Sequence, residues 1–126
     1  MCVWSYVGHI WVEARIGRED GGKWVEVKAL VDTGATLTVL PRRLAEELGL
    51  RPTGRSRVET GTGVIELERS RAIVEVMGRR EVVPVLISDI IDKVLIGVTT
   101  LEVLELEADP VTGTLRERTL LLYTAF

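Results

Sequence analysis

The sequence predicts a mainly β domain with one or two short helices, and three observations support this fold class. Apolar and polar side chains alternate along several short segments, which is the period of a half-buried strand. Turns that contain glycine separate these segments, and only two stretches carry apolar residues at helical spacing. The chain has 126 residues, of which 46% are hydrophobic, so a single domain over residues 1–126 can bury a core.

The first part of the chain is expected to form a hairpin followed by a helix. Apolar side chains alternate over residues 10–16 and again over residues 25–31, on either side of the turn Asp20–Gly22. The helix is expected from Pro41 to Leu48, because proline suits a first helical turn and Gly49 suits the end of a helix.

A second hairpin is expected in the middle of the chain, with arms at Arg57–Thr60 and Val64–Glu68. Its tip, Gly61-Thr62-Gly63, carries two glycines, which predicts an open tip rather than a tight turn. Further strands are expected at residues 72–76 and 82–87. Pro84 predicts that the second of these lies near a sheet edge or a bulge.

The last part of the chain is expected to alternate short strands with one helix. Val94–Gly97 is predicted to be a buried strand that ends in glycine. Thr99 and Glu102 have the spacing of a capping box, which predicts a short helix through Leu104. The remaining strands are expected at residues 106–108, 115–118 and 120–123.

Composition excludes several kinds of site and partner. Cys2 is the only cysteine and His9 the only histidine, so one chain cannot form an internal disulfide, a multi-histidine zinc site or a histidine-based triad. The formal net charge is -3 and the arginines are scattered between acidic residues, so we expect no nucleic-acid partner. Neither a signal peptide nor a membrane-spanning run is visible, so we expect no membrane partner and a cytoplasmic location.

The segment Leu30–Leu40 carries the strongest sign of chemistry. It sets Asp32 inside a strongly apolar stretch and follows it at once with Thr33 and Gly34. An ionised carboxylate in such surroundings must be paired, hydrogen-bonded or neutralised, which makes acid–base chemistry accessible. Asp32 is therefore the candidate catalytic residue. The alternative is an aspartate that caps its own backbone where a strand meets a turn.

Three segments together resemble the retropepsin-like aspartic peptidases, the single-lobed relatives of the retroviral protease. They are the Asp-Thr-Gly segment Leu30–Ala35, the glycine-bearing hairpin Glu59–Glu66 at the position of a flap, and the apolar strand Val94–Gly97 that enters a helix. The resemblance implies a closed β-barrel, the acid protease fold, acting as a homodimer on polypeptide or peptide substrates. Each subunit would supply one Asp32 to a shared site.

The resemblance also implies roles for individual residues. The two Asp32 carboxylates would share one proton and activate a water molecule, without metal or cofactor. Support of the active-site loop is expected from Thr33, Gly34, Ala35 and Thr38. The flap is expected at Thr60, Gly61, Thr62 and Gly63, and an apolar substrate pocket at Leu37, Val39, Ile96 and Gly97.

Some residues depart from the retroviral pattern. Val98 follows Gly97 where retroviral relatives carry an interface arginine, and Thr36 and Leu37 replace their acidic pair. These departures favour the cellular, bacterial or archaeal, branch of the family. They also indicate that the dimer is sealed differently, with Trp4, Tyr6 and the segment Leu120–Phe126 as candidates.

Several alternatives stay open at this point. The same fold could serve as a dimeric peptide-binding or scaffolding module with little turnover, or could process only its own precursor. A site within one chain could combine Asp32 with Glu59. Asp89 and Asp92 could bind a cation, although a solvated turn is the simpler interpretation, and Arg42 with Arg43 is interpreted as solvated surface.

Overall fold

The computed structural model describes residues 10–122. These residues form nine strands and two helices. In chain order they are β1 (Ile10–Gly17), β2 (Trp24–Val31), β3 (Thr38–Pro41), α2 (Arg42–Leu48), β4 (Gly54–Thr60), β5 (Gly63–Val76), β6 (Arg79–Ser88), β7 (Leu95–Ile96), α3 (Val98–Val103), β8 (Leu106–Asp109) and β9 (Thr114–Glu117). The prediction of a mainly β fold with two short helices is confirmed.

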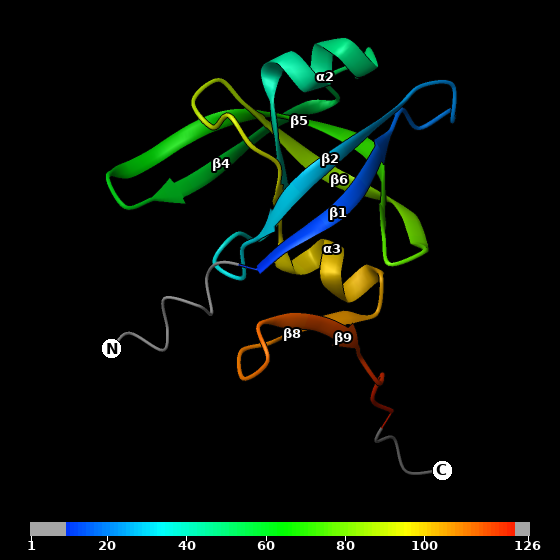
Figure 1. Ribbon diagram of the computed structural model, residues 1–126. Helices are drawn as coiled ribbons and strands as arrows, with labels where there is room; N and C mark the ends of the chain where they lie inside the picture. Colours follow the sequence, from blue (N-terminus) through cyan, green and yellow to red (C-terminus); the bar gives the residue numbers. More distant parts are fainter. Residues whose placement is uncertain (1–9, 123–126) are drawn as a thin grey trace.

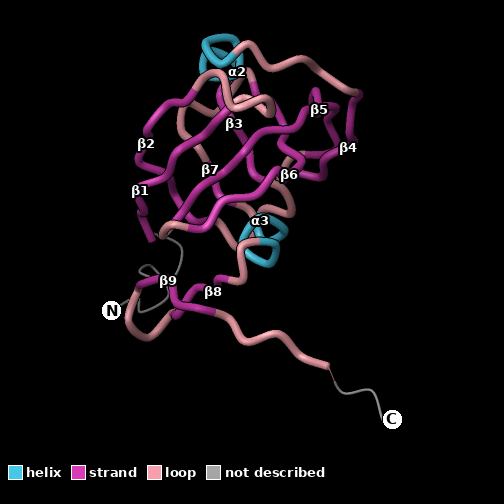
Figure 2. Tube along the Cα trace, turned by 90° about the vertical axis from the view of Figure 1, so that its right-hand side faces the viewer, coloured by secondary structure: helices cyan, strands magenta, loops and turns pink. Residues whose placement is uncertain are grey.

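Seven strands form one sheet in the order β1-β2-β7-β3-β6-β5-β4, and β1 also pairs with β5. This extra pairing closes β1, β2, β7, β3, β6 and β5 into a circuit. The remaining strand, β4, is attached as the outer arm of the β4–β5 hairpin. Figure 1 shows this hairpin projecting to one side, with α2 and α3 at opposite ends of the circuit. Figure 2 shows the same arrangement from the side.

The core follows the alternation predicted for the first hairpin. Ile10, Ala14 and Ile16 of β1 are buried, and so are Ala29 and Val31 of β2, while the residues between them are exposed or half-buried. The two strands pair in antiparallel register through the turn at Gly21, whose φ is 76°. A period-two pattern with one buried face therefore determined the register of these strands.

The first helix ends as expected but begins one residue late. Pro41 closes β3 in extended conformation and is the N-cap of α2 rather than part of its first turn. Gly49 ends the helix in the left-handed region with φ 71°, and its N–H donates to the carbonyl of Glu46. Leu44 and Leu48 are buried against the circuit.

The predicted start of the second helix was wrong. No side chain caps α3, which begins at Val98 with Gly97 as its N-cap, so Thr99 lies inside the helix. The N–H groups of Val98 and Thr99 donate to the carbonyls of Ala35 and Thr36, at 2.8 and 3.0 Å. These loop carbonyls satisfy N–H groups that a capping box would otherwise serve.

The β4–β5 hairpin is longer and tighter than predicted. Thr60 pairs with Gly63 across a two-residue turn, and the Thr60 hydroxyl donates to the Gly63 carbonyl at 2.8 Å, so the expected open tip was wrong. The strand β5 then continues without a break to Val76. Pro84 lies in the interior strand β6, just before the pairing with β3 begins at Val85, so the predicted edge position holds only locally.

The C-terminal segment forms a small separate sheet. The strands β8 and β9 pair with each other below α3 (Figure 1), and Leu106 and Leu115 pack into the main core. The strand predicted at residues 120–123 was wrong over residues 120–122, which have no regular structure and expose their leucine side chains. Tyr123 and the other candidates for sealing the dimer, Trp4, Tyr6 and residues 124–126, lie outside the described residues.

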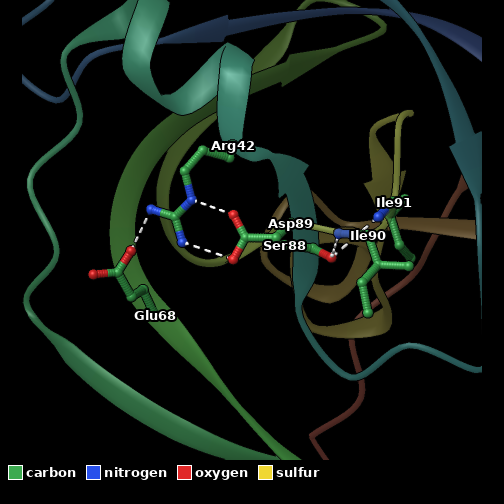
Figure 3. Close-up of polar contacts among 6 residues, drawn as sticks. All are labelled: Arg42, Glu68, Ser88, Asp89, Ile90 and Ile91. Atoms are coloured by element: carbon green, nitrogen blue, oxygen red, sulfur yellow. Dashed lines mark hydrogen bonds and ion pairs between the residues drawn. The ribbon is translucent and has the colours of Figure 1, made fainter.

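An ion-pair cluster replaces the solvated surface predicted at the start of α2. The Arg42 guanidinium donates to both oxygens of Asp89, with Nε–Oδ1 at 2.6 Å, and also to Glu68 (Figure 3). Ser88 accepts the N–H groups of Ile90 and Ile91 and so holds the loop that carries Asp89. The cluster ties α2 to the base of the β4–β5 hairpin and to the loop after β6, and the prediction for Arg42 was wrong.

We expect Arg42→Gln to destabilise the protein near neutral pH but much less in acid. The hydrogen bond from Arg42 lowers the pKa of the Asp89 carboxyl below its ordinary value of 3.8. A lowered carboxyl pKa stabilises the fold when the pH is above the ordinary pKa of the group. This contribution is lost as the pH falls through the folded-state pKa. The measurement is urea unfolding at pH about 7 and about 3, with Arg43→Gln as control. If the difference in the free energy of unfolding between wild type and Arg42→Gln is the same at both pH values, this explanation is contradicted.

Candidate active site

Asp32 lies at the first position after β2, in a turn held from both sides. Its N–H donates to the Ile96 carbonyl of β7 at 2.9 Å, and its own carbonyl accepts the N–H of Ala35 at 3.1 Å. The Gly34 N–H donates to Asp32 Oδ1 at 2.9 Å. Among residues 10–122 no hydrogen bond reaches Oδ2, so half of the carboxylate keeps its acceptor sites for a ligand.

The Asp-Thr-Gly turn faces outward. Asp32 is half-buried, whereas Thr33 and Gly34 are exposed. The bond from Gly34 shows that Asp32 does cap its own turn, as the structural alternative predicted. That bond fixes the orientation of the carboxylate and leaves it accessible, so the capping and the catalytic interpretations are compatible.

A buried hydroxyl supports this turn from inside the molecule. Thr38 has no exposed surface, and its Oγ1 lies 2.6 Å from Thr100 Oγ1 of α3. The same oxygen accepts the N–H of Gly97 at 3.1 Å. One side chain of β3 therefore connects the end of β7 with α3, directly beneath the loop that contains Ala35 and Leu37.

Gly97 is required by the close approach of that loop. A Cβ added there would lie 2.9 Å from the Ala35 carbonyl oxygen and still nearer to the backbone of Leu37. Backbone atoms held by α3 and by Thr38 cannot move aside as a flexible side chain could. The glycine at the end of β7 thus permits the two loops to pack backbone against backbone.

The Asp32 turn forms one end of a groove of about 630 Å³. The groove is lined by the residues after β2, by the body of the β4–β5 hairpin and by one residue of β6: Asp32, Gly34, Ala35, Thr36, Leu37, Val39, Ser56, Arg57, Val58, Glu59, Arg69 and Leu86. Its floor is a small apolar cluster separate from the main core, in which Val39, Leu86 and Leu95 are buried and Leu37, Val58 and Leu67 pack against them.

The structure separates the residues predicted for the substrate pocket. Leu37 and Val39 line the groove. Ile96 does not, because it is fully buried in the main core, and Gly97 does not, because the Leu37 backbone covers it. Residue type alone could not distinguish these four positions, since the strand β7 buries both of its faces.

The flap prediction identified the tip of the hairpin, but the body of the hairpin lines the groove. Ser56, Val58 and Arg69 of the hairpin body were missed. Alternation along β4 would have placed Ser56 and Val58 on one face, but the position of that face depends on the pairing of β5 with β6. Glu59 also lines the groove, although alternation turns its side chain away from the face that carries Val58.

Other candidate sites find simpler explanations. Asp89 is held by Arg42, and the Asp92 carbonyl accepts a hydrogen bond from Arg43. Within residues 10–122 no group of three or more histidine, cysteine or acidic side chains could hold a metal ion. No helix in the same range is long and apolar enough to cross a membrane.

The fold is shared with aspartic proteases of viral and cellular origin. The solution structure of the simian foamy virus (mac) protease superimposes with a TM-score of 0.54 at 26% identity, covering 73% of this chain and 91% of that one. The EIAV protease, in complex with the inhibitor HBY-793, superimposes with a TM-score of 0.62 at 21% sequence identity. The match covers 76% of this chain and 88% of that one. A retropepsin-like aspartic protease from Rickettsia conorii superimposes with a TM-score of 0.53 at 23% sequence identity. The match covers 75% of this chain and 69% of that one.

The fold therefore defines a retropepsin-like aspartic protease domain. The family model described as gag-polyprotein putative aspartyl protease matches residues 21–103, and the chain belongs to this family. A comparison with curated proteins found no match. Since both viral and bacterial structures are similar to it, membership of the cellular branch stays a prediction.

We expect Thr38→Val to destabilise the protein by about 1–3 kcal/mol, because it leaves the buried Gly97 N–H and the Thr100 hydroxyl without their shared partner. Urea unfolding measures the change. The control is Thr114→Val, an exposed strand position where a change within about 0.5 kcal/mol is expected. Equal effects of the two substitutions would show that the buried hydroxyl has no special importance.

Gly97→Ala should cost about 1–3 kcal/mol or more and should move the Asp32 turn, because the new methyl group meets backbone atoms of Leu37 and Ala35. Chemical-shift changes of the residue 32–37 amides in NMR spectra report the displacement. The control is Gly54→Ala, where the added methyl group meets nothing within 4 Å. If Gly97→Ala is tolerated as well as Gly54→Ala, the proposed backbone contact is wrong.

Proposed function

We propose that the protein is a homodimeric aspartic endopeptidase that hydrolyses peptide bonds with a water molecule held between two Asp32 carboxylates. The observation that carries this proposal is the accessible Asp32 turn at one end of a groove in a domain of the aspartic protease family. The family supports the reaction class, and the geometry of the turn supports Asp32 as the reacting group.

Two carboxylates are required by the chemistry. One carboxylate takes a proton from the attacking water while the other, protonated, donates to the peptide carbonyl oxygen. Like charges in contact cannot both ionise easily, so the pair shares one proton and titrates as a unit. Each chain contains one Asp-Thr-Gly turn, so the second carboxylate comes from a second copy.

The surface around the turn is suited to this assembly. Thr33 and Gly34 are exposed beside the carboxylate and are free to meet the same residues of another copy across a two-fold axis. The leucines at 120–122 are exposed as well, and we propose that this apolar area contributes to the assembly of the dimer. An extended peptide would lie in the groove between the Asp32 turn and the hairpin, and its backbone would pair with the hairpin as an added strand. The cytoplasmic location is part of this proposal.

We expect wild-type protein to cleave an unfolded protein substrate and Asp32→Asn to cleave none. The amide of asparagine cannot share or transfer the proton, so a loss of at least about a thousandfold in kcat/KM is expected. Mass spectrometry across acidic to neutral pH identifies the products. Sedimentation should show both proteins as dimers, which separates loss of chemistry from loss of assembly.

Binding without cleavage would favour the other candidate function. If wild type and Asp32→Asn are both dimers and both bind peptides that stay intact, the protein is a peptide-binding module of the same fold. If wild type remains a monomer at working concentration, the shared site is contradicted directly.

A further inference from the structure

Arg69 places a cation on the apolar face of the groove. On β5 it stands directly opposite Leu86 of β6, and opposed residues of neighbouring strands project from the same face of a sheet. Leu86 belongs to the apolar cluster that forms the groove floor. The side chain of Arg69 therefore leaves the sheet on the groove side, next to that floor.

The second arginine of the groove lies on the other face. Arg57 precedes Val58, which packs against the apolar floor, and successive side chains of a strand point to opposite faces. In the strand register Arg57 stands opposite Glu66, on the hairpin face away from the floor. Of the two arginines that line the groove, Arg69 is the one whose guanidinium faces it.

Unlike Arg55 and Arg71, Arg69 forms no ion pair with an acidic side chain of the part of the chain that the structure describes. Arg55 of the same hairpin pairs with Glu66, and Arg71 pairs with Glu19. Among residues 10–122, the side chain of Arg69 donates only to the Ser56 hydroxyl, at 3.3 Å. A guanidinium carries five N–H donors, so most of them stay available to a ligand.

The surroundings of Arg69 leave room for a ligand. Its cross-strand neighbour is Gly54, and no atom lies within 4 Å of the position that a Cβ would take there. The adjacent Glu68 projects to the opposite face and is held by Arg42. Glu59 is five residues further along β4 than Gly54, roughly 16 Å away.

We propose that Arg69 makes the groove selective for peptides that carry a carboxylate next to an apolar side chain. The apolar side chain packs on the floor made by Val39 and Leu86, and the carboxylate accepts two N–H groups from Arg69, a geometry that suits this side chain. The carboxylate is supplied by an aspartate or glutamate side chain or by the C-terminus of the peptide. This inference rests on the proposed endopeptidase function.

The first experiment profiles cleavage with a defined mixture of denatured proteins as the probe. Mass spectrometry of the products gives the residues at each position around the cleaved bond. Wild type should show aspartate and glutamate enriched at one position. From a cleaved sequence, peptides are then made with Glu, with Gln, and with a free or amidated C-terminus at that point, to distinguish the two sources of the carboxylate.

The expected difference is a kcat/KM roughly three- to tenfold higher for the Glu peptide than for the Gln peptide, as for a charge-assisted contact at an exposed site. Raising the salt concentration should reduce the ratio, because exposed charges are screened. Arg69→Gln should bring the ratio close to one, and Arg69→Glu should bring it below one, because the new carboxylate repels the Glu peptide. Arg55→Gln, which removes an arginine from the same hairpin outside the groove, should leave the ratio unchanged.

The outcomes separate the two proposals. If wild type cleaves but shows no preference for a carboxylate, or if Arg55→Gln loses the preference as Arg69→Gln does, the role of Arg69 is wrong while the endopeptidase function stands. If wild type cleaves nothing in the mixture, the proposed function fails and this inference fails with it. A wild-type ratio of one overturns the role of Arg69 even if an Arg69 variant does not fold.

Discussion

The buried hydroxyl of Thr38 is the interaction on which the candidate site depends. It joins two segments that are far apart in the chain, because Thr38 of β3 contacts Gly97 at the end of β7 and Thr100 in the helix α3 that follows. The carbonyls of Ala35 and Thr36 then accept the first N–H groups of α3. Polar groups in a site closed to water are costly to leave unpaired, so this network has one favourable arrangement. The Asp32 turn is therefore presented by a rigid support.

The β4–β5 hairpin forms the wall of the groove and is held in a different way from the Asp32 turn. The hairpin that forms the wall belongs to the closed circuit only through β5, while β4 is an outer arm. Its base is held where Arg42 meets Glu68, directly before Arg69. Arg42 thus links α2 to the position from which Arg69 enters the groove. The proposed chemistry at Asp32 and the proposed selectivity at Arg69 lie on separate elements, so substitutions can test them independently.

Much of the fold could be predicted because its signals are local. The alternation in β1 and β2, the turn at Gly21 and the helix end at Gly49 each depend on neighbouring residues, and the structure confirms them. Asp32 could be singled out as a candidate for the same reason, since its sequence context is contiguous, and its catalytic role stays a prediction. The glycine at position 97 was also visible, although its role as a close-approach position appears only with the Leu37 backbone beside it.

The wrong predictions share a physical cause. The capping box at Thr99 failed because carbonyls from residues 35 and 36 cap α3 instead, more than sixty residues away in the chain. The interpretation of Arg42 failed because its partners, Glu68 and Asp89, come from other strands and loops. Ile96 was assigned to the groove because burial on both faces of β7 is invisible in a two-residue strand. Each of these features is decided by tertiary contacts.

The central claim is that two copies of Asp32 act together, and subunit mixing tests it most directly. Wild type and Asp32→Asn are combined at equal concentration, allowed to exchange subunits, and assayed for peptide cleavage. If each active site needs one Asp32 from each subunit, only wild-type homodimers are active, and about a quarter of the activity of an all-wild-type sample remains at the same total protein concentration. If about half remains after full exchange, each chain acts alone and the account is contradicted.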